Sequence, residues 1–231
     1  MTKFAASLIC ADMLNLGDEL GKLERGGVDV IHYDVIDGNW ANGFGLSEKL
    51  LHRVTACSDL PIEVHLMVTD PEELIDVFAI AGVQRIIVHY EQCVHLHRTI
   101  SRVKEKGIEI GVALNPATAP SVLSYVLDDL SMITLMSINP GEIGASFLPL
   151  VLRKAEVVRS LLDECKEPLS VEIEIDGSID GSNWKPVIDA GADVLVLGST
   201  SVFASQDSLE VAITRLRKEV DSYTRSSTAH G

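Results

Sequence analysis

The fold of this chain is constrained most by a regular alternation along its 231 residues. Short runs rich in Val and Ile are separated by longer stretches in which apolar residues recur every three or four positions. Each run is apolar on both faces, which is typical of strands buried on both sides of a parallel sheet. The runs cover residues 4–10, 28–36, 61–67, 84–89, 108–114, 132–138, 169–175 and 192–197.

The intervening stretches have the periodicity of amphipathic helices, and they are centred on residues 14–23, 51–54, 74–78, 100–103, 122–126, 151–162, 184–188 and 209–216. Eight strands, each followed by a helix, predict a single (β/α)8 TIM barrel of the α/β class over residues 1–221, with a frayed polar tail at 222–231. A doubly wound sheet is the alternative, but its usual five or so strands would leave units unused. Glycines after the helical stretches are predicted to be left-handed caps, at Gly26-Gly27, Gly82, Gly107 and Gly191.

Composition excludes several classes of protein. Apolar residues make up 46% and charged residues 23% of the chain, which excludes an intrinsically disordered protein. The net charge of −15 leaves no basic surface to replace the counterions of nucleic acid or anionic lipid. No run approaches the ~18 apolar residues of a membrane span, and the first residues do not resemble a signal peptide. We therefore expect a cytoplasmic protein with neither nucleic acid nor a membrane as partner.

The cysteines predict no metal or disulfide framework. Cys10, Cys57, Cys93 and Cys165 are far apart and lack zinc-finger spacing. We expect each of them to be a buried, reduced thiol.

Polar residues stand at the carboxyl ends of four predicted strands, where barrels of this type place their functional groups. They are Ser7 on the first strand, His32 and Asp34 on the second, His65 on the third, and Glu174-Ile175-Asp176 on the seventh. His32 and Asp34 share a face because side chains alternate along a strand. Burying such groups without a partner is costly, and a set of two histidines and two aspartates suits Zn, Mn, Fe or Co.

A second set of residues predicts a phosphate site. Gly177-Ser178 follows the seventh strand and Gly198-Ser199 follows the eighth, which are the loops where such barrels hold phosphate on backbone N–H groups. Residues 200–203 are predicted to form the accompanying short helix. Neutral backbone donors would let an acidic protein bind an anion.

Together these motifs resemble the ribulose-phosphate 3-epimerase family. The resemblance extends from Ser7 to Phe203, with the motifs in the same order. They are Ser7-Leu8-Ile9-Cys10-Ala11-Asp12, His32-Tyr33-Asp34-Val35-Ile36-Asp37-Gly38, Val64-His65-Leu66-Met67-Val68, Leu114-Asn115-Pro116, Met136-Ser137-Ile138-Asn139-Pro140-Gly141 and Glu174-Ile175-Asp176-Gly177.

The resemblance implies a role for each matching residue. One divalent metal cation (Zn, Mn, Fe or Co) is expected on His32, Asp34, His65 and Asp176, with Asp34 and Asp176 as the two catalytic acid/bases. Substrate is expected to contact Ser7, His65, Met67, Met136, Gly141, Glu142, Ile143, Gly144, Gly177, Ser178, Gly198 and Ser199. Met67 and Met136 would form an apolar shelf, although core packing explains them equally well. The family also implies a homo-oligomer, a dimer or a hexamer.

The activity implied is a metal-dependent ketose-phosphate 3-epimerase, by default converting D-ribulose 5-phosphate to D-xylulose 5-phosphate. Inverting carbon 3 through a cis-enediolate requires a proton to leave one face and another to arrive at the opposite face. Two flanking carboxylates, one ionised and one protonated, supply this chemistry, and a metal stabilises the enediolate.

Three departures from the family pattern leave the sugar open. The glycine-rich lid contains Glu142, the segment 37–43 lacks a usual histidine and proline, and Ser178 replaces a glycine. D-allulose 6-phosphate or a tetrulose phosphate is therefore an alternative substrate. A decarboxylase or aldolase would need a lysine within 34–37, where there is none. A non-catalytic sugar-phosphate-binding protein is the more remote alternative.

Among the remaining histidines, His89 ends the fourth predicted strand and is a candidate for a hydrogen bond to the site. His52, His95 and His97 are expected on the surface, and His230 in the tail.

Overall fold

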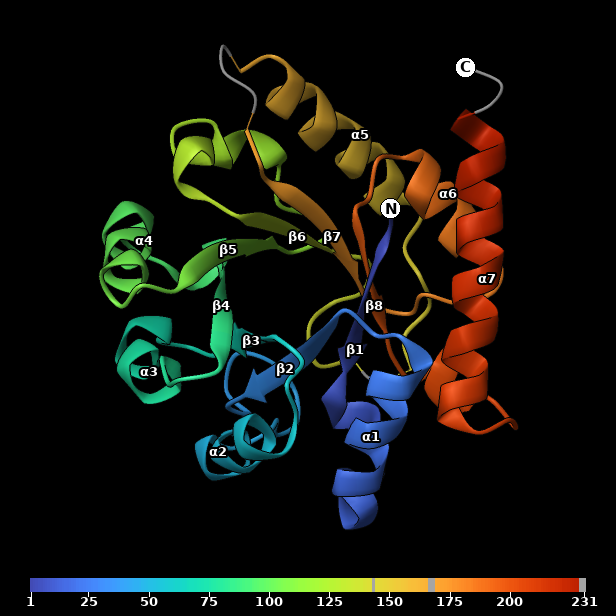
Figure 1. The fold of residues 1–231 in the computed structure, drawn as a ribbon. Helices are drawn as coiled ribbons and strands as arrows, with labels where there is room; N and C mark the ends of the chain where they lie inside the picture. The colour runs from blue at the N-terminus through green and yellow to red at the C-terminus, as the bar shows by residue number, and fades with distance from the viewer. Residues whose placement is uncertain (143, 166–168, 229–231) are drawn as a thin grey trace.

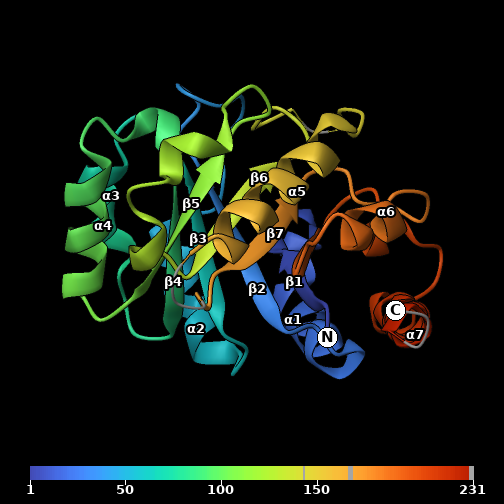
Figure 2. The same ribbon diagram turned by 90° about the horizontal axis from the view of Figure 1, so that it is seen from above.

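In a computed structural model, which describes residues 1–142, 144–165 and 169–228, the chain forms a closed barrel of parallel strands in sequential order. The eight predicted strands are all present (Figures 1 and 2). They are β1 (Lys3–Ser7), β2 (Val30–Ile36), β3 (Ile62–Met67), β4 (Val83–His89), β5 (Glu109–Leu114), β6 (Met132–Met136), β7 (Glu172–Asp176) and β8 (Val194–Leu197). Pairing of β1 with β8 closes the barrel, and the predicted TIM barrel is confirmed.

The described part of the chain contains seven α-helices, arranged around the outside of the strands in Figure 1. They are α1 (Leu16–Gly26), α2 (Glu48–Cys57), α3 (Pro71–Phe78), α4 (Leu96–Glu105), α5 (Leu150–Asp163), α6 (Trp184–Asp189) and α7 (Leu209–Thr228). Gly27 caps α1 in the left-handed conformation, and Gly82, Gly107 and Gly191 also have positive φ. Gly26 is instead the last residue of α1.

The prediction of a helix around residues 122–126 is wrong. The connection from β5 to β6 consists of two short 3-10 turns, Pro120–Leu123 and Leu127–Asp129. Valines, serines and aspartates are weak helix formers, and the hydroxyl of Ser124 donates to the carbonyl of Ser121 instead. Tyr125, one of the apolar residues of this stretch, is 98% exposed.

Two apolar cores hold the barrel together. The larger one lies between the outward faces of the strands and the helices, and it includes fully buried Phe4, Tyr33 and Ile86. The smaller one fills the barrel interior and consists of Ala5, Val30, Ile87, Ala113, Met132, Val194 and Val196. Because successive side chains on a strand alternate between the faces, six of the strands contribute to both cores. The other two, β3 and β7, place polar side chains such as Glu63 and Glu174 in the interior. The alternation explains why most of the runs in the sequence are apolar on both faces.

The helix α7 continues beyond the predicted barrel boundary at residue 221, so residues 222–228 are helical rather than frayed. The reason is a contact with α6. The ring of Tyr223 packs edge-on against Trp184 at 5.5 Å, and its hydroxyl donates to Asp189 at 2.7 Å. The division of the chain at residue 221 remains a prediction.

Two further properties bear on the sequence predictions. All four cysteines are free, but only Cys93 is buried, and Cys57 is exposed on α2, contrary to expectation. Within the described ranges, none of the helices has the length and apolar character needed to cross a membrane.

Candidate active site

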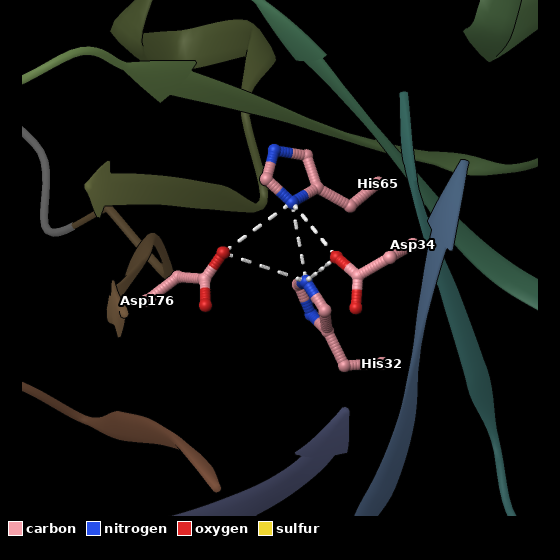
Figure 3. A group of neighbouring side chains, drawn as sticks. All are labelled: His32, Asp34, His65 and Asp176. Carbon is pink, nitrogen blue, oxygen red and sulfur yellow. Dashed lines mark hydrogen bonds and ion pairs between the residues drawn. The ribbon is translucent and has the colours of Figure 1, made fainter. Parts of the chain in front are cut away.

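The carboxyl ends of β2, β3 and β7 bring together the four residues predicted as metal ligands. Figure 3 shows His32 and His65 side by side, with Asp34 and Asp176 on opposite sides of the pair. These four residues, called here the His/Asp cluster, offer ligand atoms that all lie within 4.8 Å of one another. Both histidines are fully buried, and Asp34 is 5% exposed.

The geometry of the His/Asp cluster fits a metal ion. His32 Nε2 lies 3.2 Å from His65 Nδ1, and the four nitrogen-to-oxygen distances to Asp34 Oδ1 and Asp176 Oδ2 are 3.3, 3.8, 3.6 and 3.5 Å. Ligands about 2.1 Å from a tetrahedral ion are about 3.4 Å apart. The cluster therefore has the spacing and the mixed nitrogen and oxygen donors that such an ion requires.

The electrostatics of the cluster also favour a cation. Burial acts to lower the pKa of His32, but the charges of Asp34 and Glu174 outweigh it and hold that pKa well above its usual value. Burial likewise acts to raise the pKa of Asp34, yet the neighbouring His32 holds it below its usual value. Positive charge at this position is thus stabilised by buried carboxylates, and a divalent ion would supply it.

Side chains outside the cluster hold its members in place. Ser7 donates to Asp34 Oδ2 at 2.6 Å, from the end of β1 where the sequence placed it. His32 Nδ1 lies 2.8 Å from Glu63 Oε1, and His65 Nε2 lies 2.9 Å from the ring nitrogen of His89. The prediction that His89 forms a hydrogen bond to the site agrees with this contact.

Sequence reasoning missed Glu63 and Arg85. Both point into the barrel one layer below the cluster, and the guanidinium of Arg85 donates to Glu63 Oε2 at 3.1 Å. The available signal was alternation: Glu63 precedes His65 by two positions and therefore shares its face. Glu174 lies in the same lower layer, where it accepts a hydrogen bond from Thr134 and where burial raises its pKa.

A cavity of about 250 Å³ opens above the cluster. Its lining includes most of the predicted substrate contacts, namely Ser7, Met67, Met136, Gly141, Glu142, Gly144, Gly177, Ser178, Gly198 and Ser199, together with Asp34 and Asp176. His65 is not among the lining residues, because it is buried beneath them. Ile143 falls outside the described residues. Ile9, Cys10, Ile36, Ile138 and Val196 also line the cavity and were not predicted.

The two predicted phosphate loops both reach this cavity. Gly177 and Ser178 adopt positive φ values of 114° and 47°, and the Ser178 hydroxyl donates to the carbonyl of Ala145 at 2.6 Å. A side chain at position 177 would collide with Ile138, so this turn requires glycine. The predicted short helix after β8 is present as a 3-10 turn at Val202–Ala204.

Two of the departures from the family pattern have clear positions. Glu142 lines the cavity, and its carboxylate accepts a hydrogen bond from the Asn139 side chain at 3.2 Å. Trp40, which belongs to the altered segment 37–43, packs against the ring of His89, with centroids 4.3 Å apart. His52, His95 and His97 are exposed, as predicted, and His230 lies outside the described residues.

Comparison with known proteins identifies the family. The sequence profile of the ribulose-phosphate 3 epimerase family matches residues 3–203. The chain is 42% identical to ribulose-phosphate 3-epimerase from Bacillus subtilis, over 90% of this chain and 94% of the relative. It is 37% identical to chloroplastic ribulose-5-phosphate-3-epimerase from Arabidopsis thaliana, over 88% of this chain and 72% of the relative.

Solved structures agree on the fold. The structure of KGPDC from Streptococcus mutans superposes with a TM-score of 0.71 at 12% identity and covers 96% of this chain and 99% of its own. At that identity the likeness concerns the barrel alone. The profile match and the two curated relatives, by contrast, span nearly the whole barrel, so the chain belongs to the ribulose-phosphate 3-epimerase family of isomerases.

Proposed function

We propose that this protein is a metal-dependent ketose-phosphate 3-epimerase that interconverts D-ribulose 5-phosphate and D-xylulose 5-phosphate. The observation that carries the proposal is the placement of Asp34 and Asp176 on opposite sides of the histidine pair, both facing one cavity (Figure 3). The names of the curated relatives support the same reaction and substrate.

The two carboxylates account for inversion at carbon 3. In one direction, ionised Asp34 takes the proton from carbon 3 on one face, and the carboxyl of Asp176 gives its proton to the opposite face. In the reverse direction the two residues exchange roles. Ser7 donates a hydrogen bond to Asp34 Oδ2, which stabilises the ionised form and orients the carboxylate.

The His/Asp cluster would hold one divalent cation, and its mixed nitrogen and oxygen donors suit Zn, Mn, Fe or Co. A bound cation would supply Lewis-acid stabilisation of the negative charge that develops on the carbonyl and hydroxyl oxygens of the substrate. The chain itself supplies an apolar part of the cavity wall. It is formed by Met67 and Met136, which are 4% and 2% exposed.

The phosphate group would bind between the loops Gly177-Ser178 and Gly198-Ser199. Both loops line the cavity, and their backbone N–H groups can donate to a dianion without a basic side chain. This is the arrangement that a chain with a net charge of −15 needs. We also infer a cytoplasmic homo-oligomer, a dimer or hexamer, with neither nucleic acid nor a membrane as partner.

A different ketose phosphate is the second candidate, because Glu142 brings a carboxylate to the cavity lining. That carboxylate would repel a phosphate placed beside it but could accept a hydrogen bond from an additional sugar hydroxyl. D-allulose 6-phosphate has such a hydroxyl. A non-catalytic sugar-phosphate-binding protein has no need of two opposed carboxylates and is less well supported.

Proton exchange tests the proposal. The metal-loaded protein is incubated in D₂O with D-ribulose 5-phosphate and, separately, with D-allulose 6-phosphate, and carbon 3 is followed by NMR. We expect deuterium at carbon 3 together with the epimer, faster with the pentulose. A faster reaction with the hexulose would assign the second substrate. Binding of both sugars without exchange would show that the protein is a binding protein and not an epimerase.

A further inference from the structure

We propose that Glu91, acting through His89, is a positioning residue that fixes the tautomer of His65 needed for metal binding. The inference rests on the proposed metal site but concerns residues outside the His/Asp cluster. It is carried by an unbroken line of contacts from the cluster to the connection between β5 and β6.

The line begins at the two nitrogens of His65. Nδ1 faces the cluster, 3.6 Å from Asp34 Oδ1 and 3.5 Å from Asp176 Oδ2. Nε2 faces away from the cluster and lies 2.9 Å from His89 Nε2. The two ring planes are nearly parallel, at 21° to each other, with centroids 4.9 Å apart, and both side chains are fully buried. No bulk water therefore competes for these ring nitrogens.

Metal binding by His65 determines which ring nitrogens of His65 and His89 carry a hydrogen. A histidine ligates a metal through a lone pair, so Nδ1 of His65 must be unprotonated and its Nε2 must carry the hydrogen. Two ring nitrogens 2.9 Å apart need one donor and one acceptor. His89 Nε2 must then accept, which places the hydrogen of His89 on its Nδ1.

The atom that faces His89 Nδ1 is a carboxylate oxygen. Glu91 Oε2 lies 3.4 Å from it, and neither atom has another hydrogen-bond partner in the described part of the chain. A carboxylate oxygen only accepts. Glu91 therefore favours the one tautomer of His89 that can accept from His65.

The other oxygen of Glu91 is held by the connection that follows β5. Oε1 accepts hydrogen bonds from the backbone N–H of Asn115, at 2.9 Å, and from the hydroxyl of Thr118. The buried amine of Lys154 on α5 donates to the Asn115 carbonyl at 2.7 Å. These contacts fix which oxygen of Glu91 faces His89.

That asymmetry makes Glu91→Gln a sharp test. The two donors at Oε1 require the amide oxygen at that position, which turns the amide NH₂ toward His89 Nδ1. His89 would then carry its hydrogen on Nε2, facing the Nε2 hydrogen of His65. The variant keeps the size of the side chain and reverses the donor and acceptor roles of the two ring nitrogens of His89.

We expect Glu91→Gln to weaken metal affinity by about 10- to 100-fold, the usual effect of losing an outer hydrogen-bonding partner of a metal ligand. Affinity is measured by competition with a chromophoric chelator, using zinc and cobalt. The matched control is Glu72→Gln on α3, whose carboxylate accepts from the Thr99 hydroxyl at 3.0 Å and from Arg98, away from the site. We expect the control to bind metal as the wild type does.

The tautomers are read directly from the nitrogen NMR shifts of the histidines in the zinc-loaded wild type. This measurement does not depend on the folding of any variant. We expect hydrogen on Nδ1 of His89 and on Nε2 of His65. Hydrogen on Nε2 of His89, or equal metal affinities for wild type and Glu91→Gln, would overturn the positioning role of Glu91 while leaving the epimerase proposal intact. A wild-type protein that binds no divalent metal would overturn both the positioning role of Glu91 and the metal-dependent reaction.

Discussion

Asp176 ends β7 at the mouth of the barrel, where it lines the cavity and faces both histidines of the His/Asp cluster. In the proposed reaction it exchanges a proton with carbon 3 on the face opposite Asp34. An amide at this position cannot take up or release that proton. We expect Asp176→Asn to lower turnover by at least about 10²-fold, measured by the D₂O exchange rate with D-ribulose 5-phosphate.

The matched control for Asp176→Asn is Asp128→Asn, at an exposed position between β5 and β6. It removes the same charge away from the cavity, and we expect wild-type turnover. Circular dichroism should show that both variants retain the fold. If Asp176→Asn kept more than about a tenth of wild-type activity, Asp176 could not be one of the two acid/bases.

At the scale of elements, the connection from β2 to α2 crosses the end of its own strand. Gly45 donates its N–H to the carbonyl of Ile36, and Leu46 donates to that of Asp34. A methyl group at Gly45 would lie 2.3 Å from the Ile36 nitrogen and 2.5 Å from the Asp34 oxygen. Both atoms belong to the backbone and cannot move aside without shifting Asp34. We expect Gly45→Ala to cost about 2–4 kcal/mol in the free energy of unfolding and to reduce metal affinity.

The matched comparison is Gly17→Ala, near the start of α1. A methyl group there meets nothing within 4 Å, and alanine favours helix by about 0.5–1 kcal/mol over glycine. Urea unfolding of the two variants should therefore give changes of opposite sign. An unchanged free energy of unfolding in Gly45→Ala would show that the connection from β2 to α2 has room for a methyl group at this position.

At the scale of the whole molecule, the barrel closes around a buried charge. Arg85 on β4 is 7% exposed, and its guanidinium contacts strands on both sides, at Glu63 on β3, Glu109 on β5 and Glu172 on β7, besides Ser131. Removing the cation leaves the fully buried carboxylate of Glu63 without its ion-pair partner, whereas Glu109 and Glu172 are 44% and 22% exposed. We expect Arg85→Met to destabilise the protein by about 3–5 kcal/mol, measured by urea unfolding.

The control for Arg85 is Arg98→Met on α4, which breaks an ion pair with Glu72 at 3.0 Å but whose side chain is 63% exposed. Surface pairs contribute only about 0–1 kcal/mol, so a small change is expected. Equal losses for the two variants would contradict a special role for the interior network.

The barrel and the polar residues at its mouth can be predicted from the amino-acid sequence alone. Eight runs apolar on both faces leave few alternatives to a closed parallel sheet, because only buried strands need two apolar faces. Alternation along a strand places His32 and Asp34 on one face, and the ends of parallel strands meet at one edge. These are local rules, so the position of Asp176 at the same edge also followed from its place at the end of a run.

The contacts beneath and behind the His/Asp cluster could not be predicted in this way, because they depend on how the strands pack together. Glu63 contacts His32 because the register of β2 and β3 sets them opposite each other. Arg85 on β4 contacts carboxylates on the two adjacent strands, β3 and β5, and on the more distant β7. The line from His65 through His89 to Glu91 likewise depends on how β3, β4 and the chain after β5 are staggered around the barrel. Register and stagger arise when the sheet closes, since closure sets the tilt and offset of all strands together. The residue pattern along one strand predicts which face of the sheet each side chain lies on. It does not predict which side chains of the other strands it contacts.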